Sequence, residues 1–195
     1  MSKVEFRGWP KMKRDNPFHV VITEKIDGTN ACIIIRDGKI VGVQSRKRLI
    51  TPEDDNFGFA GWVYTNQEEL LKLGEGYHYG EWAGPGIQKN PHGLEDKTFF
   101  LFNTGRWMSN EDRPRCCSVV PLLHVGLLEP ETVPNLLLDL VSTYDDAEYC
   151  TGSDVSPEGV CVYYPAFDKY TKHTIKSPNG KWYKEPHGYG TTKSD

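Results

Sequence analysis

Short runs rich in apolar residues, separated by turn-forming residues, fill most of the chain's first fifty positions. The runs are Phe18–Ile22, Ala31–Ile35 and Lys39–Gln44. Asp27-Gly28 separates the first two runs and Asp37-Gly38 separates the second two. Asp-Gly between apolar runs is a strong signal for a tight hairpin turn. We therefore predict a β meander of three strands, with Lys25 at the end of the first strand and Arg46 just after the third.

The rest of the chain alternates short strand-like runs with loops. Further strands are expected at Tyr77–Tyr79, Thr98–Asn103, Val119–Val125, Gly159–Tyr164 and Tyr170–Lys176. Apolar residues three and four positions apart predict a helix over Glu131–Tyr144, and a shorter helix over Gln67–Leu73 should stop at Gly74. Residues 51–62 and 105–118 read as loops. Many short strands with few helices predict an antiparallel α+β domain.

Length and composition indicate one domain and exclude several classes of protein. The 195 residues suit a domain over residues 1–185 with a polar tail over 186–195. A net charge of −4 argues against bulk coating of nucleic acid. Because the sequence has neither an apolar run long enough for a membrane span nor a secretory signal, we expect a cytoplasmic protein.

The five cysteines predict reduced thiols rather than a disulfide framework. Their number is odd, and no Cys-x-x-Cys pair or zinc-ligand spacing occurs. Cys32 and Cys161 lie inside apolar runs, which predicts that both are small core residues. Trp62, Trp82 and Trp107 are interpreted as packing residues.

Several polar or aromatic residues fall at predicted strand ends beside turns, where a sheet can hold functional groups rigidly. They are Lys25, Arg46, Glu81, Phe102-Asn103, Glu158 and Lys176. Taken singly, each has an ordinary structural interpretation: Lys25 as an exposed residue before a turn, Phe102 as core, and the two glutamates as turn residues. A lysine amine can act as a nucleophile only where nearby cations or desolvation make its neutral form available.

Five short segments, taken in their order along the chain, resemble the motifs of a known protein family. The segments are Glu24–Asn30 (EKIDGTN), Ser45-Arg46, Tyr79–Gln88 (YGEWAGPGIQ), Phe99–Thr104 (FFLFNT) and Pro157–Val162 (PEGVCV). In this order they resemble the motifs of the covalent nucleotidyltransferases, and within them the phage-type ATP-dependent RNA ligases related to the second RNA ligase of phage T4. The resemblance spans residues 23 to 176 and implies an ATP-grasp-like nucleotidyltransferase (adenylation) domain.

The resemblance implies a role for each matched residue. Lys25 would attack the α-phosphate of ATP, and the lysyl-AMP would pass adenylate to an RNA 5′-phosphate, which a 3′-hydroxyl then joins with release of AMP. Arg46 would hold a phosphate, Glu81 would accept from ribose hydroxyls, and Phe102 would stack on adenine. Glu158 would bind Mg²⁺ or Mn²⁺. Residues also implied at the ATP site are Glu24, Asn30, which would orient a metal-bound water, and Lys172.

Two positions depart from the family pattern. The last motif usually has two lysines one residue apart, whereas Thr174-Ile175-Lys176 has only the second. Lys176 is expected to contact phosphate. Either Lys172 or Thr174 would take the place of the missing first lysine. The aromatic motif usually ends in Phe-Asp and here ends in Phe102-Asn103. A C-terminal OB or other second domain is not expected after residue 185, which leaves room for a protein partner in its place.

Four functions stay open at this point. The leading hypothesis is an ATP-dependent RNA ligase that acts in RNA repair, in the host cytoplasm if a phage encodes it. A DNA or nick ligase and a GTP-using capping enzyme are the alternatives within the same superfamily, and Thr29-Asn30 favours the RNA type. The fourth is a nucleic-acid-binding module that has lost its chemistry, which the presence of Lys25, Glu81 and Glu158 argues against.

Overall fold

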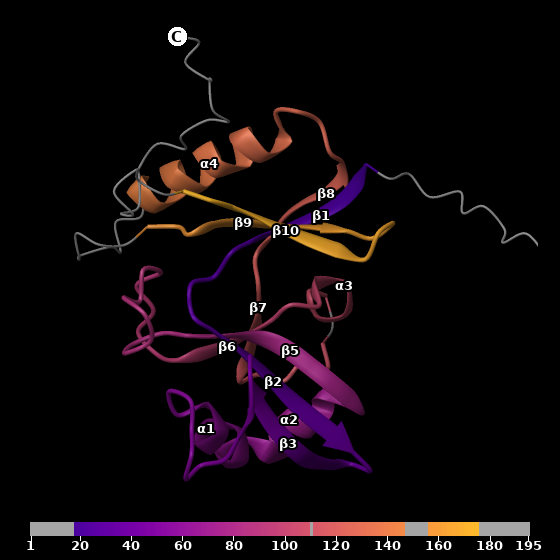
Figure 1. Ribbon diagram of the computed structural model, residues 1–195, viewed down its shortest axis with the longest axis vertical. Helices are drawn as coiled ribbons and strands as arrows, with labels where there is room; N and C mark the ends of the chain where they lie inside the picture. The colour runs from indigo at the N-terminus through magenta and orange to yellow at the C-terminus, as the bar shows by residue number, and fades with distance from the viewer. Residues whose placement is uncertain (1–17, 110, 147–155, 176–195) are drawn as a thin grey trace, which may run out of the picture.

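The computed structural model describes residues 18–109, 111–146 and 156–175, whose strands form two sheets (Figure 1). The four-stranded sheet has the order β10 (Lys169–Thr174), β9 (Gly159–Tyr164), β1 (His19–Glu24), β8 (Leu122–Leu127). The six-stranded sheet has the order β4 (Leu49–Ile50), β3 (Lys39–Ser45), β2 (Thr29–Arg36), β5 (Gly76–Ala83), β6 (Thr98–Leu101), β7 (Cys117–Val119). All neighbouring pairs are antiparallel except β6 and β7, which are parallel. The four-stranded sheet is therefore wholly antiparallel, as predicted, whereas the six-stranded sheet is mixed.

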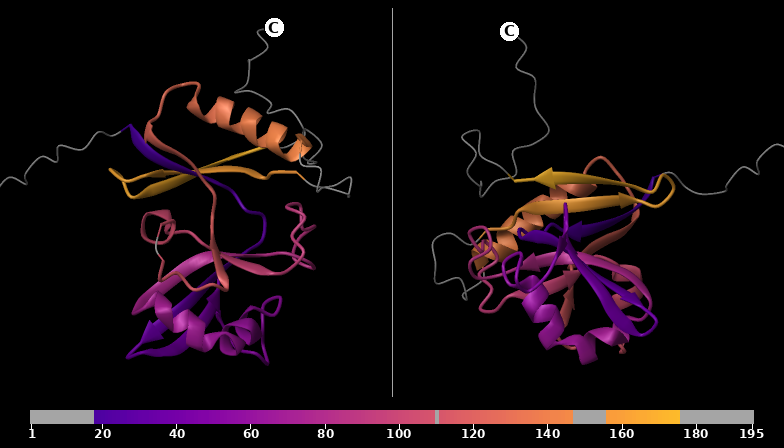
Figure 2. Two further views of the ribbon diagram at one scale, coloured as in Figure 1. Left: turned by 180° about the vertical axis from the view of Figure 1, so that it is seen from behind. Right: turned by 60° about the horizontal axis from the view of Figure 1, so that its bottom comes forward.

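Helices cover the outer faces of both sheets, with the exception of α3 (Thr104–Trp107), which Figure 1 shows at the level between them. The other helices are α1 (Phe59–Thr65), α2 (Gln67–Leu70), the 3₁₀ helix η1 (Leu71–Leu73) and α4 (Thr132–Asp146). Figure 1 shows α4 above the four-stranded sheet and α1 and α2 below the six-stranded sheet, and Figure 2 shows the same order from behind. The described chain is therefore layered as helix, sheet, sheet, helix.

The two larger of the three buried apolar clusters among the described residues follow from this layering. In one, Ile33 of β2 and Phe99 of β6 pack with Phe59 of α1, whose ring centroid lies 5.0 Å from that of Phe99. In the other, Leu137 of α4 packs on Val162 of β9. Each sheet thus buries its outer face and leaves its inner face toward the other sheet. Trp82 and Trp107 are buried and Trp62 packs against the first core, as predicted.

The predicted β meander is wrong at its first turn. β1 pairs with β8 and β9, whereas β2 pairs with β3 and β5, so the two strands belong to different sheets. Residues 25–28 carry the chain from one sheet to the other instead of forming a hairpin. The second predicted turn is confirmed, because Asp37 and Gly38 both have positive φ and join the paired strands β2 and β3.

Other boundaries also differ from the prediction. α1 begins at Phe59, inside the region expected to be a loop, and residues 105–118 include most of α3 and the start of β7. β5 continues through Ala83, well beyond the predicted strand, because pairing with β2 and β6 outweighs the glycine in its middle. The helix predicted over Gln67–Leu73 ends as η1 before Gly74, whose φ is +75°. The longer helix predicted over Glu131–Tyr144 is confirmed by α4.

Candidate active site

Lys25 lies where the chain leaves β1 for the six-stranded sheet. Its backbone N–H donates to the carbonyl oxygen of Gly159 at 2.8 Å, which extends the pairing of β1 with β9 by one residue. This register places Glu158 beside Lys25, and the Lys25 Nζ forms an ion pair with a Glu158 carboxylate oxygen. Two motifs that are 133 residues apart in the chain therefore meet through strand pairing.

Gly28 lets the crossing segment lie close against β5. A Cβ added to Gly28 would lie 2.4 Å from the carbonyl oxygen of Trp82, so only glycine fits without movement of the backbone. Two residues later, Asn30 is the cross-strand partner of Glu81, and its Nδ2 donates to Glu81 Oε2 at 2.8 Å. Asn30 thus orients the Glu81 carboxylate in this structure.

Two of the three buried glutamates, Glu81 and Glu158, have raised pKa values. Burial is the main cause for Glu81 and raises its pKa to about 7, against the opposing effect of the Lys25 charge. The negative charges of Glu158 and Asp27 raise it further. Burial likewise raises the pKa of Glu158, and the contact with Lys25 works against that rise. Lys25, Glu81 and Glu158 are therefore close enough to act on one another electrostatically.

A pocket on the inner face of the six-stranded sheet lies next to Glu81, because Asn30 both lines it and binds the Glu81 carboxylate. Its volume is about 190 Å³, and its lining includes Asn30, Arg46, Tyr79 and Phe102. Phe102 is 41% exposed, so its interpretation as a core residue is wrong. The Asn103 side chain accepts a hydrogen bond from the Arg106 N–H at 3.0 Å and caps α3. The unusual residue after Phe102 therefore has a local structural role.

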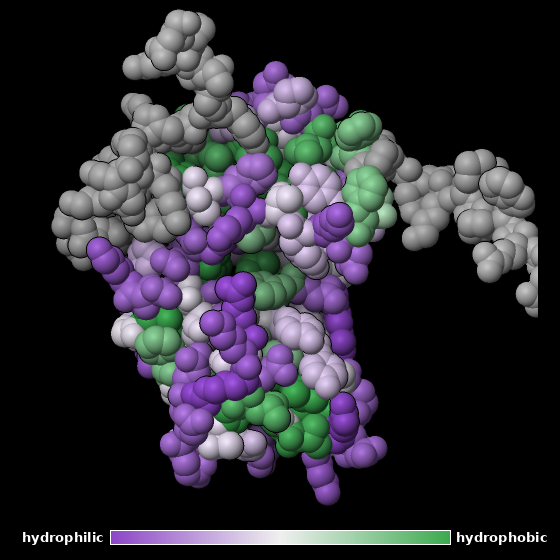
Figure 3. All heavy atoms as spheres, in the orientation of Figure 1, coloured by the Kyte–Doolittle hydropathy of each residue, from purple (hydrophilic) through white to green (hydrophobic). Residues whose placement is uncertain are grey.

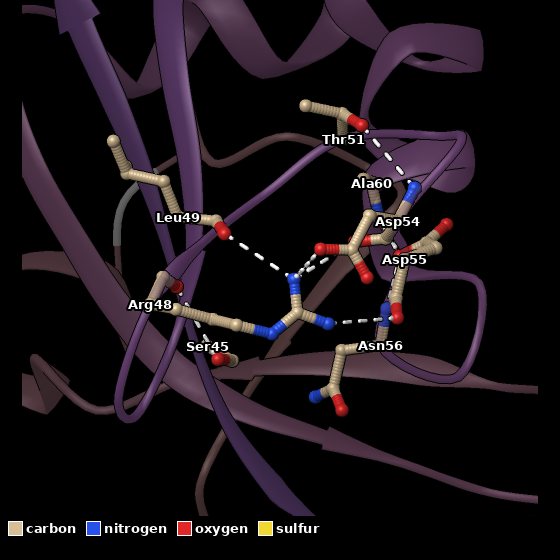
Figure 4. A network of polar contacts seen from close by, with 8 residues as sticks. All are labelled: Ser45, Arg48, Leu49, Thr51, Asp54, Asp55, Asn56 and Ala60. Atoms are coloured by element: carbon tan, nitrogen blue, oxygen red, sulfur yellow. Dashed lines mark hydrogen bonds and ion pairs between the residues drawn. The ribbon is translucent and has the colours of Figure 1, made fainter.

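Arg46 lies in the turn between β3 and β4, and that turn is anchored by Arg48 (Figure 4). The Ser45 N–H donates to the Arg48 carbonyl oxygen at 2.9 Å and closes the turn. The Arg48 guanidinium donates to a carboxylate oxygen of Asp54 at 2.6 Å and to the Asp54 carbonyl oxygen at 3.1 Å. The two arginines of this turn therefore differ: Arg48 fixes the turn, while Arg46 lines the pocket.

Asp55 connects the same loop to α1 and to the first motif. Its carboxylate accepts hydrogen bonds from the N–H groups of Ala60 at 2.8 Å and Gly61 at 2.9 Å. Backbone N–H groups in the first turn of a helix have no acceptor within the helix, so Asp55 supplies one. The neighbouring Asn56 side chain donates to the Thr29 hydroxyl at 3.1 Å. This loop was predicted as irregular, and only its side-chain contacts show that it supports the start of β2.

The last motif approaches the site through the edge strand β10. Lys172 on β10 is the cross-strand partner of Cys161 on β9, and its positive charge opposes the rise in the pKa of Glu158. Thr174 pairs with Gly159, two residues further on and on the same face as Lys172. Lys176 lies outside the described residues. Cys161 is half-buried on this face rather than in the core, which corrects its predicted place.

The residue types at the junction suit a hard divalent cation together with phosphate. Carboxylate oxygens are the protein ligands that Mg²⁺ and Mn²⁺ prefer, and Glu158 and Glu81 supply them within reach of each other's charge. Within the described ranges, no three His, Cys, Asp or Glu side chains form a metal-binding group. A cation here would thus need oxygen ligands from a phosphate or from water in addition to a carboxylate.

The family model for RNA ligases matches residues 18–177, most of the chain. The chain belongs to the RNA ligase family. None of the curated proteins matches it. Among the described helices of this family member, none is long and apolar enough to cross a membrane.

Solved structures of Naegleria gruberi RNA ligase share the fold. A variant with ATP and Mn superposes with a TM-score of 0.59 at 19% identity, over 81% of this chain and 50% of that chain. The same ligase with pyrophosphate gives 0.57 and 19%, over the same shares. A variant with AMP and Mn gives 0.56 and 18%, also over 81% and 50%. This chain thus spans about half the length of the ligase chains that it matches.

His92 is a site residue that the sequence analysis missed. Its Nε2 accepts a hydrogen bond from the Asp27 N–H at 2.7 Å, and its Nδ1 lies 3.5 Å from a carboxylate oxygen of Glu24. The side chains of His92 and Glu24 are only 4% and 8% exposed. His92 thus connects the loop after β5 to Glu24 and Asp27, one residue before and two residues after Lys25. It is a lone histidine in a loop 65 residues from Asp27, so no local pattern could have identified it.

Proposed function

We propose that this chain is an ATP-dependent RNA ligase that joins 5′-phosphate and 3′-hydroxyl ends through a lysyl-AMP intermediate on Lys25. The observation that supports this most is that Lys25 directly after β1, Glu158 directly before β9 and Glu81 in β5 meet at one junction between two sheets. Family membership favours RNA ends over DNA ends. The residues of the five motifs support a closer relation to the phage-type RNA ligases.

In the first step, the Lys25 Nζ would attack the α-phosphorus of ATP. A phosphorus–nitrogen bond forms, and the bond to the β-phosphate breaks, so pyrophosphate leaves. The amine must lose a proton to solvent before it attacks, and its Nζ lies in contact with the Glu158 carboxylate. A divalent cation bound at Glu158 would neutralise phosphate charge and favour the neutral form of the nearby amine.

The remaining residues would position the nucleotide and the RNA end. Phe102, half-exposed at the pocket, offers a face on which adenine can stack. Glu81, oriented by Asn30, would accept hydrogen bonds from ribose hydroxyls. Arg46 and Lys172 would neutralise phosphate charge, because phosphoryl transfer depends mainly on alignment and on charge stabilisation. The solved relatives with ATP and Mn support this choice of nucleotide and metal.

Some parts of the proposal rest on the motif resemblance alone. These are the roles of Glu24 and of Lys176, a role in RNA repair, and a protein partner. The relatives' chains are about twice as long as this one, so sealing by this chain alone is part of the proposal.

The test is covalent labelling of the full chain with α-labelled ATP and either Mg²⁺ or Mn²⁺, followed by a denaturing gel. We expect a labelled protein band for the unaltered chain and for Lys72→Ala, which alters an exposed lysine on η1. Lys25→Ala should give no band. Equal labelling of Lys25→Ala would show that the assigned nucleophile is wrong.

A sealing assay then separates the remaining alternatives. Strands with a 5′-phosphate, as RNA and as DNA, are tested as single strands and in nicked duplexes. Joining of RNA ends supports the proposal. Joining of DNA ends alone would favour the nick ligase, and labelling by GTP in preference to ATP would favour a capping enzyme. Neither labelling nor sealing by the folded chain would favour a binding module without catalysis.

A further inference from the structure

A row of exposed aromatic rings extends from the pocket along β5. Because side chains alternate along a strand, Tyr77, Tyr79 and Glu81 point to the same face of the sheet. Tyr77 is 48% exposed and Tyr79 is 53% exposed, and their near-parallel rings have centroids 6.2 Å apart. Tyr79 also lines the pocket together with Phe102, which lies beside it through a backbone hydrogen bond. We call Phe102, Tyr79 and Tyr77 the aromatic stripe.

The aromatic stripe is not part of either core. The apolar side chains of the six-stranded sheet that pack on α1 point the other way. In the space-filling view, ring-shaped side chains lie on the surface over β5, beside a hollow between the upper and lower parts of the molecule (Figure 3). Contiguous exposed rings next to a binding pocket are typical of a surface that contacts a ligand.

Positive charge lies at the end of the stripe away from the pocket. The Arg36 guanidinium donates to the Tyr77 hydroxyl at 3.1 Å and lies 6.0 Å from the ring centroid. Lys39 is the cross-strand partner of Arg36 on β3. The nearby Glu75 carboxylate already accepts hydrogen bonds from the Asp37 and Gly38 N–H groups, at 3.0 and 2.8 Å. Arg36 and Lys39 are therefore the cations at this end of the stripe, beside the carboxylates of Asp37 and Glu75.

We propose that the aromatic stripe binds a short single-stranded segment of the RNA substrate, next to the end that occupies the active site. Bases would stack on the Tyr77 and Tyr79 rings, while Arg36 and Lys39 would contact phosphates. Exposed aromatic rings combined with cations are the means by which proteins bind single strands without reading their sequence. The segment is continuous with the pocket, because Tyr79 belongs to both. This inference rests on the proposed function.

RNA affinity is the direct test, measured by fluorescence anisotropy with a labelled 12-nucleotide RNA that carries a 5′-phosphate. Tyr77→Leu should weaken binding about tenfold, since it removes a stacking face. Tyr77→Phe keeps the ring and should bind within about threefold of the unaltered chain. Tyr64→Leu, which alters an equally exposed tyrosine on α1, is the matched control and should leave affinity unchanged. A blunt RNA duplex, whose bases are already stacked, should show no Tyr77 dependence.

The role of Arg36 is tested separately, by the salt dependence of RNA affinity. Arg36→Ala should reduce the slope of log affinity against log salt by about 0.7, because one phosphate contact on a single strand is lost. In addition, photo-crosslinking of the unaltered chain to an RNA that contains 5-iodouridine should label Tyr77 or Tyr79, a result that requires no variant to fold. Crosslinks confined to other segments would overturn the proposal.

Lysine labelling separates this proposal from the proposed function. Tyr77→Leu and Arg36→Ala should label with ATP like the unaltered chain, because neither residue lines the nucleotide pocket. If the unaltered chain labels but Tyr77→Leu and Tyr64→Leu bind RNA equally well, the aromatic stripe alone is wrong. If the unaltered chain does not label, the proposed function fails, and RNA binding still decides whether the stripe is a single-strand site. Absence of RNA binding by the unaltered chain would overturn the stripe proposal.

Discussion

Replacing Glu81 by glutamine should make the protein more stable at neutral pH. Burial holds the pKa of Glu81 at about 7 in the folded protein, against 4.5 as its ordinary value. Between these two pH values the folded protein keeps a proton that the unfolded chain has released. A rise in pH therefore favours unfolding across this window, and the effect saturates above about pH 7.

The size of the effect follows from the same two values. A shift of one pKa unit corresponds to about 1.4 kcal/mol, so the raised pKa lowers the free energy of unfolding by about 3 kcal/mol above pH 7. Glutamine is neutral at every pH and keeps an oxygen that can accept from the Asn30 side chain. The variant should match the unaltered chain near pH 4.5 and exceed it by about 3 kcal/mol at pH 8.

Urea unfolding followed by tryptophan fluorescence, at steps from pH 4.5 to 8, measures this difference. The quantity of interest is the free energy of unfolding of Glu81→Gln minus that of the unaltered chain, which cancels the titration of other groups. Glu68→Gln, an exposed glutamate on α2, is the matched control and should give a flat difference. A flat difference for Glu81→Gln as well would refute the reasoning that burial raises the pKa of Glu81.

Three further substitutions test the supports of the site. His92→Ala removes the acceptor of the Asp27 N–H, and we expect lysine labelling to slow about tenfold, because an unpaired buried donor costs about 1–3 kcal/mol. Gly28→Ala forces a Cβ to 2.4 Å from a β5 carbonyl oxygen, and chemical denaturation should show a loss of about 2 kcal/mol or more. Asp55→Ala leaves the first N–H groups of α1 without their acceptor, and thermal unfolding should show a loss of about 1–2 kcal/mol.

Each of these expectations has a contrary outcome. His92→Ala that labels at the normal rate would show that this histidine does not position the segment around Lys25. Gly105→Ala has only an ordinary contact at 3.7 Å and should be tolerated, so equal losses at Gly28 and Gly105 would contradict the close-approach argument. For Asp55, the control is Glu53→Ala, which alters an exposed carboxylate of the same loop; an equal loss there would contradict the capping role.

The local pattern of residues was enough to predict most strands and the long helix. Alternating and continuous apolar runs mark β2, β3 and β9, and the 3.6-residue period marks α4. Asp37-Gly38 was correctly predicted as a hairpin turn, because its positive φ values are a property of the turn itself. The order of short motifs likewise indicated the family. All of these are features that a few neighbouring residues decide.

The tertiary structure decided which strands pair, and with that the architecture of the site. Asp27-Gly28 has the same two residues as the hairpin turn Asp37-Gly38, yet it carries the chain from one sheet to the other. β1 pairs with two strands, β8 and β9, whereas a hairpin at Asp27-Gly28 would pair it with β2. Gly28 is required there by the approach of β5 and not by a turn.

The partners of Glu24 and Asp27 show the same limit. His92 meets both through contacts that connect segments more than sixty residues apart along the chain. The exposure of Phe102 and the alignment of Tyr77 with Tyr79 likewise depend on which face of the sheet the helices cover. Short-range propensity depends on a residue's neighbours in the chain, whereas these contacts depend on how whole sheets pack, which only the folded molecule fixes.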